Sequence, residues 1–320
     1  MRPIYKIEAD GKDVTANFLS RLISLTCTDE SGFDSDELTI TVDNSGTRLK
    51  PPKKGVVLTV YLGYEETNLL KIGEYIVDEP EFAGPPDLVI IRGRAADLRN
   101  QLKSGKSRSW SNKTIGDIVK VIASEHGMKP RVSDVLSGIL IPHIDQTSES
   151  DLNFITRLAQ DYDAIAKPAA KNLIFTPRYQ SKSVSGIDLP QILISKSNAI
   201  NYRLTLADRT SIGHVVAYFQ DKAKVRRTGI TVGDPALAGK RLKRTYATEQ
   251  EARKAAESAL ADFKRGKREL SLTLEGDPAI KAECPLVLNG WPEPFDDKYV
   301  VNYVEHRMDE GGYTTVLNAN

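Results

Sequence analysis

Three acidic side chains offer the most specific chemistry in the sequence. Asp145, Glu149 and Asp151 stand close together, around the start of a predicted helix. Two carboxyl groups held side by side can hydrolyse a glycosidic bond, one giving a proton while the other attacks or activates water. The same acids would also cap a helix and offset its dipole without any reaction. The spacing leaves a polysaccharide-cutting enzyme open, although helix capping explains it more simply.

Histidines give no sign of a metal or catalytic centre. The four are His126, His143, His214 and His306, and no two are four residues apart, as a helical zinc motif of the HExxH type requires. His126 falls near the end of a predicted helix, where the dipole favours it. The sequence also lacks a GxSxG elbow, a Walker loop and a GxGxxG turn. We therefore predict no catalytic residue, no metal and no cofactor.

Basic residues gather in three runs. The runs are 222–227, 240–244 and 264–268. They can be solvated loop and helix-end charge, a nucleic-acid groove, or a surface for an acidic partner or for DNA passing through a pore. A nucleic-acid groove would need stacking aromatics, and few stand among the runs. The candidate contact residues are Arg226, Arg227, Lys240 and Arg241.

An apolar loop near the end of the chain has two prolines. It reads Trp-Pro-Glu-Pro-Phe, from Trp291 to Phe295. Such a loop marks a contact surface if it is exposed. It could equally be a buried plug at the end of a barrel. Trp291 and Phe295 are therefore further candidates for partner contact.

Composition describes an ordinary folded protein. The 320 residues suffice for two or three domains, and 40% hydrophobic with 27% charged residues is not a disordered composition. A net charge of +1 argues against a protein built mainly to coat nucleic acid. Cys27 and Cys284 are far apart, so we expect free thiols and neither a zinc framework nor a disulfide scaffold. The first residues lack the apolar stretch of a secretory signal, and we expect assembly in a cytosol.

Residues 1–100 are predicted to be β-structure. Glu37–Asp43 alternates apolar and polar residues, 56–62 does the same, and 88–93 is a further strand. Gly and Pro clusters separate these segments, which is typical of a sandwich or barrel.

Residues 101–190 are predicted to be a small α/β module. Thr114 can cap one helix, and the segment 148–151 can cap another. Two short strands, 165–168 and 173–177, form a predicted hairpin.

Residues 191–320 are predicted to return to β-structure with one helix. The helix starts at the capping box that Thr248 opens and covers about 248–265. The predicted strands are 202–206, 270–274, 300–304 and 313–317.

A weak internal repeat links the two β regions. The turn and strand around Tyr75 resemble those around Tyr299, 224 residues later. In both places an apolar strand precedes the unit, and a Gly-containing turn and a further strand follow it. If the repeat is real, the chain holds one β-fold twice, with the α/β module between the copies.

The segment 147–159, Thr-Ser-Glu-Ser-Asp-Leu-Asn-Phe-Ile-Thr-Arg-Leu-Ala, resembles a signature of the phage late control D proteins. These are baseplate hubs of contractile tails, and the hub portion of VgrG spike proteins of type VI secretion is similar. The segments 112–118, 165–175, 276–280 and 306–315 add weaker likeness.

The resemblance implies a mainly β fold with an α+β insertion: two tail-tube-like barrels, at 1–100 and 191–320, flanking the module at 101–190. It implies a homotrimer that joins the sixfold tail tube to a threefold central spike, as a structural part of the virion baseplate of a phage or tailocin. The implied partners are the tail tube protein, a trimeric spike protein and other baseplate proteins, with a tape measure protein as a further candidate. DNA would pass only as transient cargo, and no stable membrane association is implied.

Two other functions stay open on the residues. One is a muralytic tail enzyme that uses Asp145, Glu149 or Asp151. The other is a DNA-binding regulator, which the basic runs suggest and the near-zero net charge disfavours.

Overall fold

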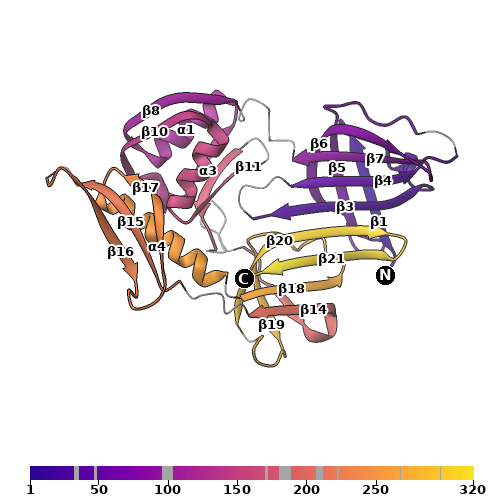
Figure 1. Cartoon of the computed structure of the whole chain (residues 1–320). Helices are drawn as coiled ribbons and strands as arrows, with labels where there is room; N and C mark the ends of the chain where they lie inside the picture. Colours follow the sequence, from indigo (N-terminus) through magenta and orange to yellow (C-terminus); the bar gives the residue numbers. More distant parts are fainter. Residues whose placement is uncertain are drawn as a thin grey trace. The chain divides into compact units, whose positions relative to one another are not determined.

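A computed structural model describes residues 1–31, 36–46, 49–95, 104–169, 172–179, 189–206, 212–221, 223–266, 268–295 and 297–320, with only the backbone described at positions 79 and 169. The contacts divide the chain into two compact units (Figure 1). The first unit holds Met1–Leu98, Pro190–Leu204 and Leu270–Ala319, and the second holds Arg99–Leu189 and Thr205–Glu269, with Asn320. Strands dominate the described residues, so the predicted mainly β class with an α+β insertion is confirmed.

The first unit begins with a run of antiparallel strands, which we call the N-terminal repeat. Its strands are β1 (Pro3–Ala9), β3 (Leu22–Glu30), β4 (Glu37–Asp43), β5 (Val57–Tyr64), β6 (Leu70–Ala83) and β7 (Leu88–Ala95); the two-residue β2 (Lys12–Asp13) pairs with β1, and a 3-10 turn, η1, covers Thr15–Asn17. They lie side by side in the order β1-β5-β6-β7-β4-β3. The alternation seen in the sequence puts Leu38, Ile40 and Val42 of β4 in the core.

The rest of the first unit, the C-terminal repeat, has the same order of strands. Its strands are β13 (Ile192–Ser195), β14 (Ala199–Leu206), β18 (Arg268–Glu275), β19 (Pro285–Asn289), β20 (Lys298–Asp309) and β21 (Gly312–Ala319), with a 3-10 turn, η3 (Lys196–Asn198), between the first two. They lie in the order β13-β19-β20-β21-β18-β14. When the strands of each repeat are counted along the chain, the first, fourth, fifth, sixth, third and second strands lie side by side in that order in both repeats. One pairing differs, because β13 runs parallel to β19 whereas β1 runs antiparallel to β5.

The registers of the two repeats also agree. Tyr75 of β6 pairs with Leu58, and Tyr299 of β20 pairs with Leu286. Both tyrosines are 2% exposed. An irregularity then follows at the same place, between Val77 and Pro80 in β6 and between Val301 and Tyr303 in β20. The repeat predicted from the two tyrosines is therefore present in the strand pairing.

A left-handed residue precedes the same strand in both repeats. Gly55, with φ 89°, donates its N–H to the Val77 carbonyl over 2.9 Å. Glu283, with φ 68°, donates in the same way to the Val301 carbonyl over 2.8 Å. Neither β5 nor β19 covers this edge of the long strand beyond that point.

The second unit contains the predicted α/β module. Its elements are β8 (Gly105–Thr114), α1 (Ile115–Glu125), β9 (Lys129–Val132), α2 (Asp134–Ser137), β10 (Leu140–Ser150), α3 (Asp151–Asp161), β11 (Ala164–Ala169) and β12 (Asn172–Pro177). Thr114 caps α1 through a capping box, as predicted, and the left-handed Gly127 follows the helix. Ser150 caps α3, whose buried face includes Asp151 and Phe154. The hairpin of β11 and β12 is also confirmed.

A three-stranded sheet and one long helix complete the second unit. They are β15 (His214–Asp221), β16 (Arg226–Gly233), β17 (Gly239–Tyr246) and α4 (Glu249–Arg265), and the sheet has the order β16-β15-β17. Thr248 caps α4 as predicted. Alanines and Leu260 on α4 pack against Val215, Ala217 and Phe219 of the sheet.

This sheet and helix are attached to the α/β module. The Ser258 hydroxyl of α4 donates to the Gln160 carbonyl over 2.6 Å, and the Tyr246 hydroxyl donates to Asp161 over 2.9 Å. The ranges 1–100, 101–190 and 191–320 remain a prediction about domains. The contacts differ from it at two places, because they put both β regions into one unit and group residues 205–269 with the module instead of with the C-terminal repeat.

Candidate functional site

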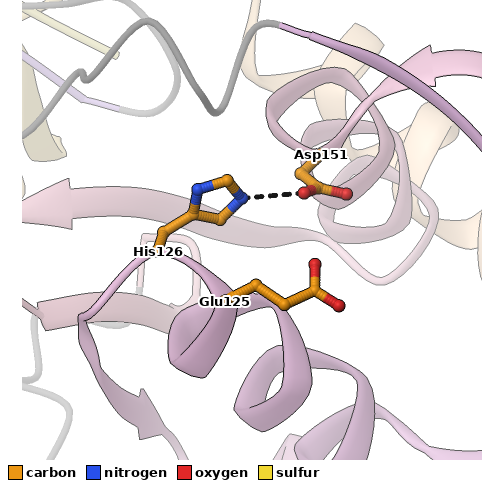
Figure 2. A group of neighbouring side chains, drawn as sticks. All are labelled: Glu125, His126 and Asp151. Carbon is orange, nitrogen blue, oxygen red and sulfur yellow. Dashed lines mark hydrogen bonds and ion pairs between the residues drawn. The ribbon is translucent and has the colours of Figure 1, made fainter.

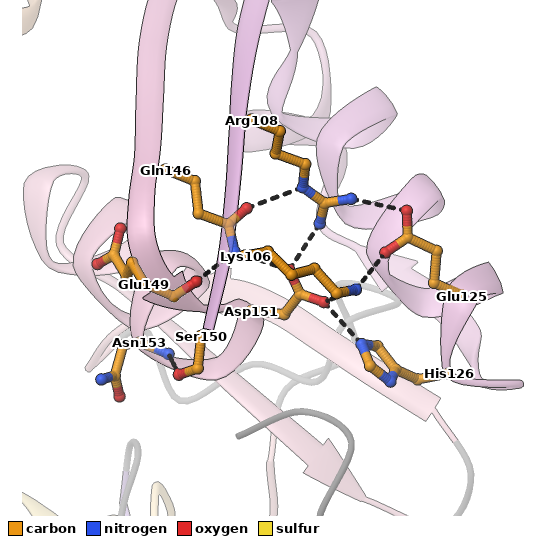
Figure 3. Close-up of polar contacts among 9 residues, drawn as sticks. All are labelled: Lys106, Arg108, Glu125, His126, Gln146, Glu149, Ser150, Asp151 and Asn153. Carbon is orange, nitrogen blue, oxygen red and sulfur yellow. Dashed lines mark hydrogen bonds and ion pairs between the residues drawn. The ribbon is translucent and has the colours of Figure 1, made fainter. Parts of the chain in front are cut away.

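The acidic residue of the 147–159 motif lies in a buried ionic cluster (Figure 3). Asp151 is fully buried at the first position of α3. Lys106 Nζ and Arg108 Nη2 of β8 each lie 2.6 Å from its carboxylate. The Gln146 amide donates to it over 2.8 Å, and His126 Nε2 is also 2.8 Å away. We call these five residues, together with Glu125, the Asp151 cluster.

The cluster keeps Asp151 ionised. Burial alone would raise the pKa of this carboxyl, but hydrogen bonds from Lys106, Gln146 and His126 and the charge of Arg108 lower it to about 2. Glu125 neutralises the outer side of the same cations, with ion pairs of 2.8 Å to Lys106 and 2.6 Å to Arg108. The carboxylate therefore holds the start of α3, the end of α1 and strand β8 together.

This geometry opposes the glycosidase alternative. A general acid needs a raised pKa, whereas Asp151 has a lowered one. Glu149 is paired with Arg157 at 2.7 Å. Asp145 accepts a hydrogen bond from the Ser109 hydroxyl, which lowers its pKa. All three acids therefore have structural partners.

Glu125, His126 and Asp151 also come close enough to hold a metal ion (Figure 2). Their ligand atoms lie within 4.8 Å of one another. Lys106 and Arg108 already occupy the carboxylate oxygens, and a divalent cation would meet two resident positive charges. The donor set does not fit a metal site.

The sequence interpretation missed the partners of Asp151. Lys106, Arg108 and Trp110 alternate along β8, so all three point to one face of the strand. Arg108 lies over the Trp110 ring at 4.4 Å, and Trp110 stacks on Phe154 of α3 at 5.9 Å. This alternation was the available signal, but it could not identify an acid more than forty residues away as the partner.

The four basic candidates lie on the small sheet of the second unit. Arg226 and Arg227 begin β16, and Lys240 and Arg241 lie in β17, and all four are exposed. Arg227 covers the ring of Tyr218 at 3.9 Å. Their role in partner contact stays a prediction; Lys222 and Lys267 of the basic runs lie outside the described residues.

The apolar loop of the C-terminal repeat is folded inward. Trp291 is 7% exposed and donates its indole N–H to the Ile194 carbonyl over 3.1 Å. Phe295 and Tyr202 pack on its ring, at 5.2 Å and 4.9 Å. These contacts favour the plug over the open contact surface, and a role in partner contact stays a prediction.

Strand β3 of the N-terminal repeat pairs with β20 of the C-terminal repeat. We call this pairing the repeat joint (Figure 1, purple β3 beside yellow β20). Residues 24–30 of β3 face residues 303–309 of β20 in an antiparallel register. The Ser31 N–H continues the pairing to the Asn302 carbonyl over 2.8 Å, and the Ser31 hydroxyl bonds to Glu283. The joint merges both repeats into one sheet.

A buried histidine supports the joint. His306 of β20 is 2% exposed and faces Cys27 of β3. Its Nε2 lies 3.2 Å from the Ile280 carbonyl, so Nε2 carries the proton, and Nδ1 accepts from the Tyr313 hydroxyl at 2.9 Å. Burial lowers the pKa of His306 to about 4, so the ring is neutral.

Cys27 and Cys284 are both buried free thiols. No helix in the described ranges has the length and apolar character needed to cross a membrane.

Comparison with known proteins agrees with the fold. Residues 77–312 match the model of the phage tail baseplate hub (GPD) family. A probable baseplate hub protein of Escherichia phage P2 is 32% identical over 99% of this chain and 92% of its own length. A tail protein from Neisseria meningitidis MC58 superposes with a TM-score of 0.75 at 12% identity, over 100% of this chain and 96% of that one.

The predicted likeness to secretion proteins is present in the fold. The E. coli c3393 protein, a component of the type VI secretion system, has a TM-score of 0.56 and 11% identity, over 98% of this chain and 76% of that one. The late control D resemblance is confirmed by the family match and by the phage relative. The chain belongs to the phage tail baseplate hub family, whose members are structural components of the virion tail baseplate.

Proposed function

We propose that three copies of this hub protein form a ring of six similar sheets that adapts a sixfold tail tube to a threefold spike. The supporting observation is the repeated strand order in one chain, with matching registers around Tyr75 and Tyr299. Three such chains would present six related sheets to the tube. The differences between the repeats would keep the true symmetry threefold.

The repeat joint supports the ring physically. It shows that the edge of one repeat can pair with the long strand of the other. A contact between two different surfaces continues from one molecule to the next, and it closes into a ring when the rotation allows. Ring closure would also cover strand edges whose unpaired N–H and C=O groups favour aggregation of a free chain.

Electron microscopy of the purified assembly tests the adapter. Averages viewed along the axis are expected to show six similar lobes around a central opening, with threefold symmetry when the repeats are distinguished. Twofold particles, or lobes of unrelated structure, would contradict the proposal.

We also propose that the hub acts without catalytic turnover. The support is that Asp145, Glu149 and Asp151 each have a structural partner. Purified protein incubated with bacterial cell walls should release no more soluble sugar than buffer does. Release that disappears in Glu149→Gln would establish an enzyme instead.

The proposed partners are the tail tube protein, a trimeric spike protein and other baseplate proteins, with a tape measure protein as a further candidate. DNA would be transient cargo only. The exposed Arg226, Arg227, Lys240 and Arg241 suit an acidic surface on one of these proteins. Reversing these four charges should weaken assembly most at low salt.

A further inference from the structure

The small sheet of the second unit, β16-β15-β17, has one face covered by a helix (Figure 1, orange). Helix α4 packs on the face that carries Val215, Ala217 and Phe219 of β15. Side chains alternate along a strand, so Val216 and Tyr218 lie on the opposite face, where they are half-buried. The residues of β16 and β17 that flank them there are exposed. We call this second side of the sheet the open face.

Three cations lie on the open face. Arg227 of β16 is opposite Gln220 of β15, Arg241 of β17 is opposite Val216, and paired residues share a face of the sheet. Lys243 follows Arg241 by two residues in β17, so it lies on the same face. No ion pair within the described ranges involves any of the three cations. Their charges are therefore available to a ligand.

The other two basic candidates, Arg226 and Lys240, lie on the opposite side. Arg226 is opposite Asp221, and Lys240 lies over the Phe263 ring of α4 at 4.6 Å. The four candidates therefore form two pairs of equal charge. Both pairs come from β16 and β17, but only one pair is on the open face.

Positive charge is concentrated in this sheet. Residues 214–246 include eight Lys and Arg against two Asp and no Glu, although the whole chain has a net charge of only +1. Asp221 and Asp234 each accept a backbone N–H of a neighbouring turn over 3.0 Å. On α4, by contrast, Arg253 is paired with Glu249 of the same helix. The excess charge of the sheet favours a partner of opposite charge.

Tyr218 holds one of the three cations in place. A Cβ at Gly229 would lie 3.1 Å from the Tyr218 ring, so the ring lies against the glycine of β16. The Arg227 guanidinium covers this ring at 3.9 Å. A stacked guanidinium keeps the N–H groups at its edge available for a carboxylate. The stacking also occupies the only Tyr, Phe or Trp among the described residues of the open face, which leaves no ring for a nucleic-acid base.

We propose that the open face binds a carboxylate-rich segment of a partner protein. Arg227, Arg241 and Lys243 are the contact residues, and Tyr218 is the positioning residue. The inference rests on the proposed contact with an acidic baseplate protein and assigns that contact to one face. The cations of β16 and β17 flank β15, about 10 Å apart across the strands, so a segment that crosses the sheet can meet both.

Binding of a fluorescent polyglutamate peptide to the full-length hub at physiological salt tests the face. Arg227→Gln combined with Arg241→Gln should raise the Kd about tenfold or more, because charge-assisted hydrogen bonds are lost. Arg226→Gln combined with Lys240→Gln is the matched control, since it removes the same charge from the same two strands. Salt screens these more distant charges, so the control should change the Kd by less than about twofold. Equal losses in the two double variants would overturn the assignment to the open face.

A further pair of variants tests the positioning role of Tyr218. Tyr218→Leu keeps every charge but removes the ring under Arg227, and it should raise the Kd of polyglutamate about threefold. Tyr218→Phe keeps the ring and should bind as the wild type does. An unchanged affinity of Tyr218→Leu would reject the prepositioned guanidinium and with it this site.

Single-stranded DNA with the same number of charges serves as the second probe. Polyglutamate should bind the open face more tightly than this DNA does. If DNA binds more tightly and loses its affinity in the variant with Arg227→Gln and Arg241→Gln, the protein partner is overturned in favour of nucleic acid.

The mass of each variant in solution separates this site from the adapter role, because the open face belongs to the second unit and the repeats to the first. A hub that forms trimers but binds polyglutamate equally in both double variants rejects the site and leaves the adapter role standing. A difference between the double variants in a hub that never forms trimers supports the site and rejects the adapter role.

Discussion

Asp151 shows how a fully buried charge can serve structure rather than chemistry. Its carboxylate is shared by two cations, an amide and an imidazole, and this explains why an acidic residue starts α3 in the interior. Removing one member of a buried ion pair leaves the remaining charges buried without a partner. This loss costs more free energy than the intact pair contributes.

Asp151→Asn should lower the free energy of unfolding of the second unit by about 3 kcal/mol, the low end for a broken buried pair because Lys106 and Arg108 reach solvent. Trp110 lies in this unit and Trp291 in the other. In a Trp291→Phe background, Trp110 fluorescence therefore follows the unfolding of the second unit alone. Asp145→Asn, at an exposed position, is the control and should leave the stability of this unit nearly unchanged. Equal effects would contradict the structural role of the cluster.

His306 should make the first unit sensitive to mild acid. It is the only histidine of that unit. Burial outweighs the opposite influence of Asp29 and Asp277, so the folded pKa is about 4, below the roughly 6.5 of a free histidine. The unfolded chain then takes up a proton before the folded one does. Stability is complete above about pH 6.5 and falls, on the order of 3 kcal/mol, as the pH drops to about 4.

Chemical unfolding of a Trp110→Phe protein is followed by Trp291 fluorescence at several pH values. It measures the slope of the free energy of unfolding of the first unit against pH. A His306→Gln variant should lose most of the slope between pH 6.5 and 4.5, whatever its stability at neutral pH. An unchanged slope in the variant would assign the pH dependence to other groups.

At the scale of elements, a left-handed residue in each repeat limits how much of the long strand's edge is covered by β5 or β19. The chain reaches the long strand at Gly55 and at Glu283 through the same backbone hydrogen bond, and β5 and β19 begin two residues later, so their pairing does not extend beyond Val77 and Val301. The repeat joint uses the β20 edge beyond Val301.

Gly55→Ala should destabilise the first unit by about 1 kcal/mol, because an L-residue at φ 89° is strained. A Cβ there would meet nothing within 4 Å, so the cost is conformational and not steric. Gly46→Ala, equally open and without a positive φ, should be neutral or slightly stabilising. Denaturant unfolding of both variants compares them, and a neutral Gly55→Ala would remove the strain argument.

The sequence predicted most elements because their signals are local. Alternation located β4, capping boxes located α1 and α4, and Tyr75 with Tyr299 located the repeat. Alternation says which side chains are buried but not which strand edges meet, so the repeat joint could not be predicted. The contacts of α4 with the α/β module could not be predicted for the same reason. It depends on contacts such as that of Ser258 with Gln160, 98 residues apart.

For the whole molecule, two insertions separate the architecture from a plain tandem repeat. The α/β module lies between the repeats in sequence, and β15–β17 with α4 interrupt the C-terminal repeat between β14 and β18. Both insertions belong to the second unit. The insertions leave the repeated strand order intact, as the proposed ring of six sheets requires.

Native mass spectrometry over a concentration series, with and without the spike protein, tests the central claim most directly. The hub should reach three times the 35.4 kDa of one chain, as the only closed assembly, either alone or once the spike protein is added. A monomer under all these conditions, or a closed dimer, would contradict the ring of six repeats.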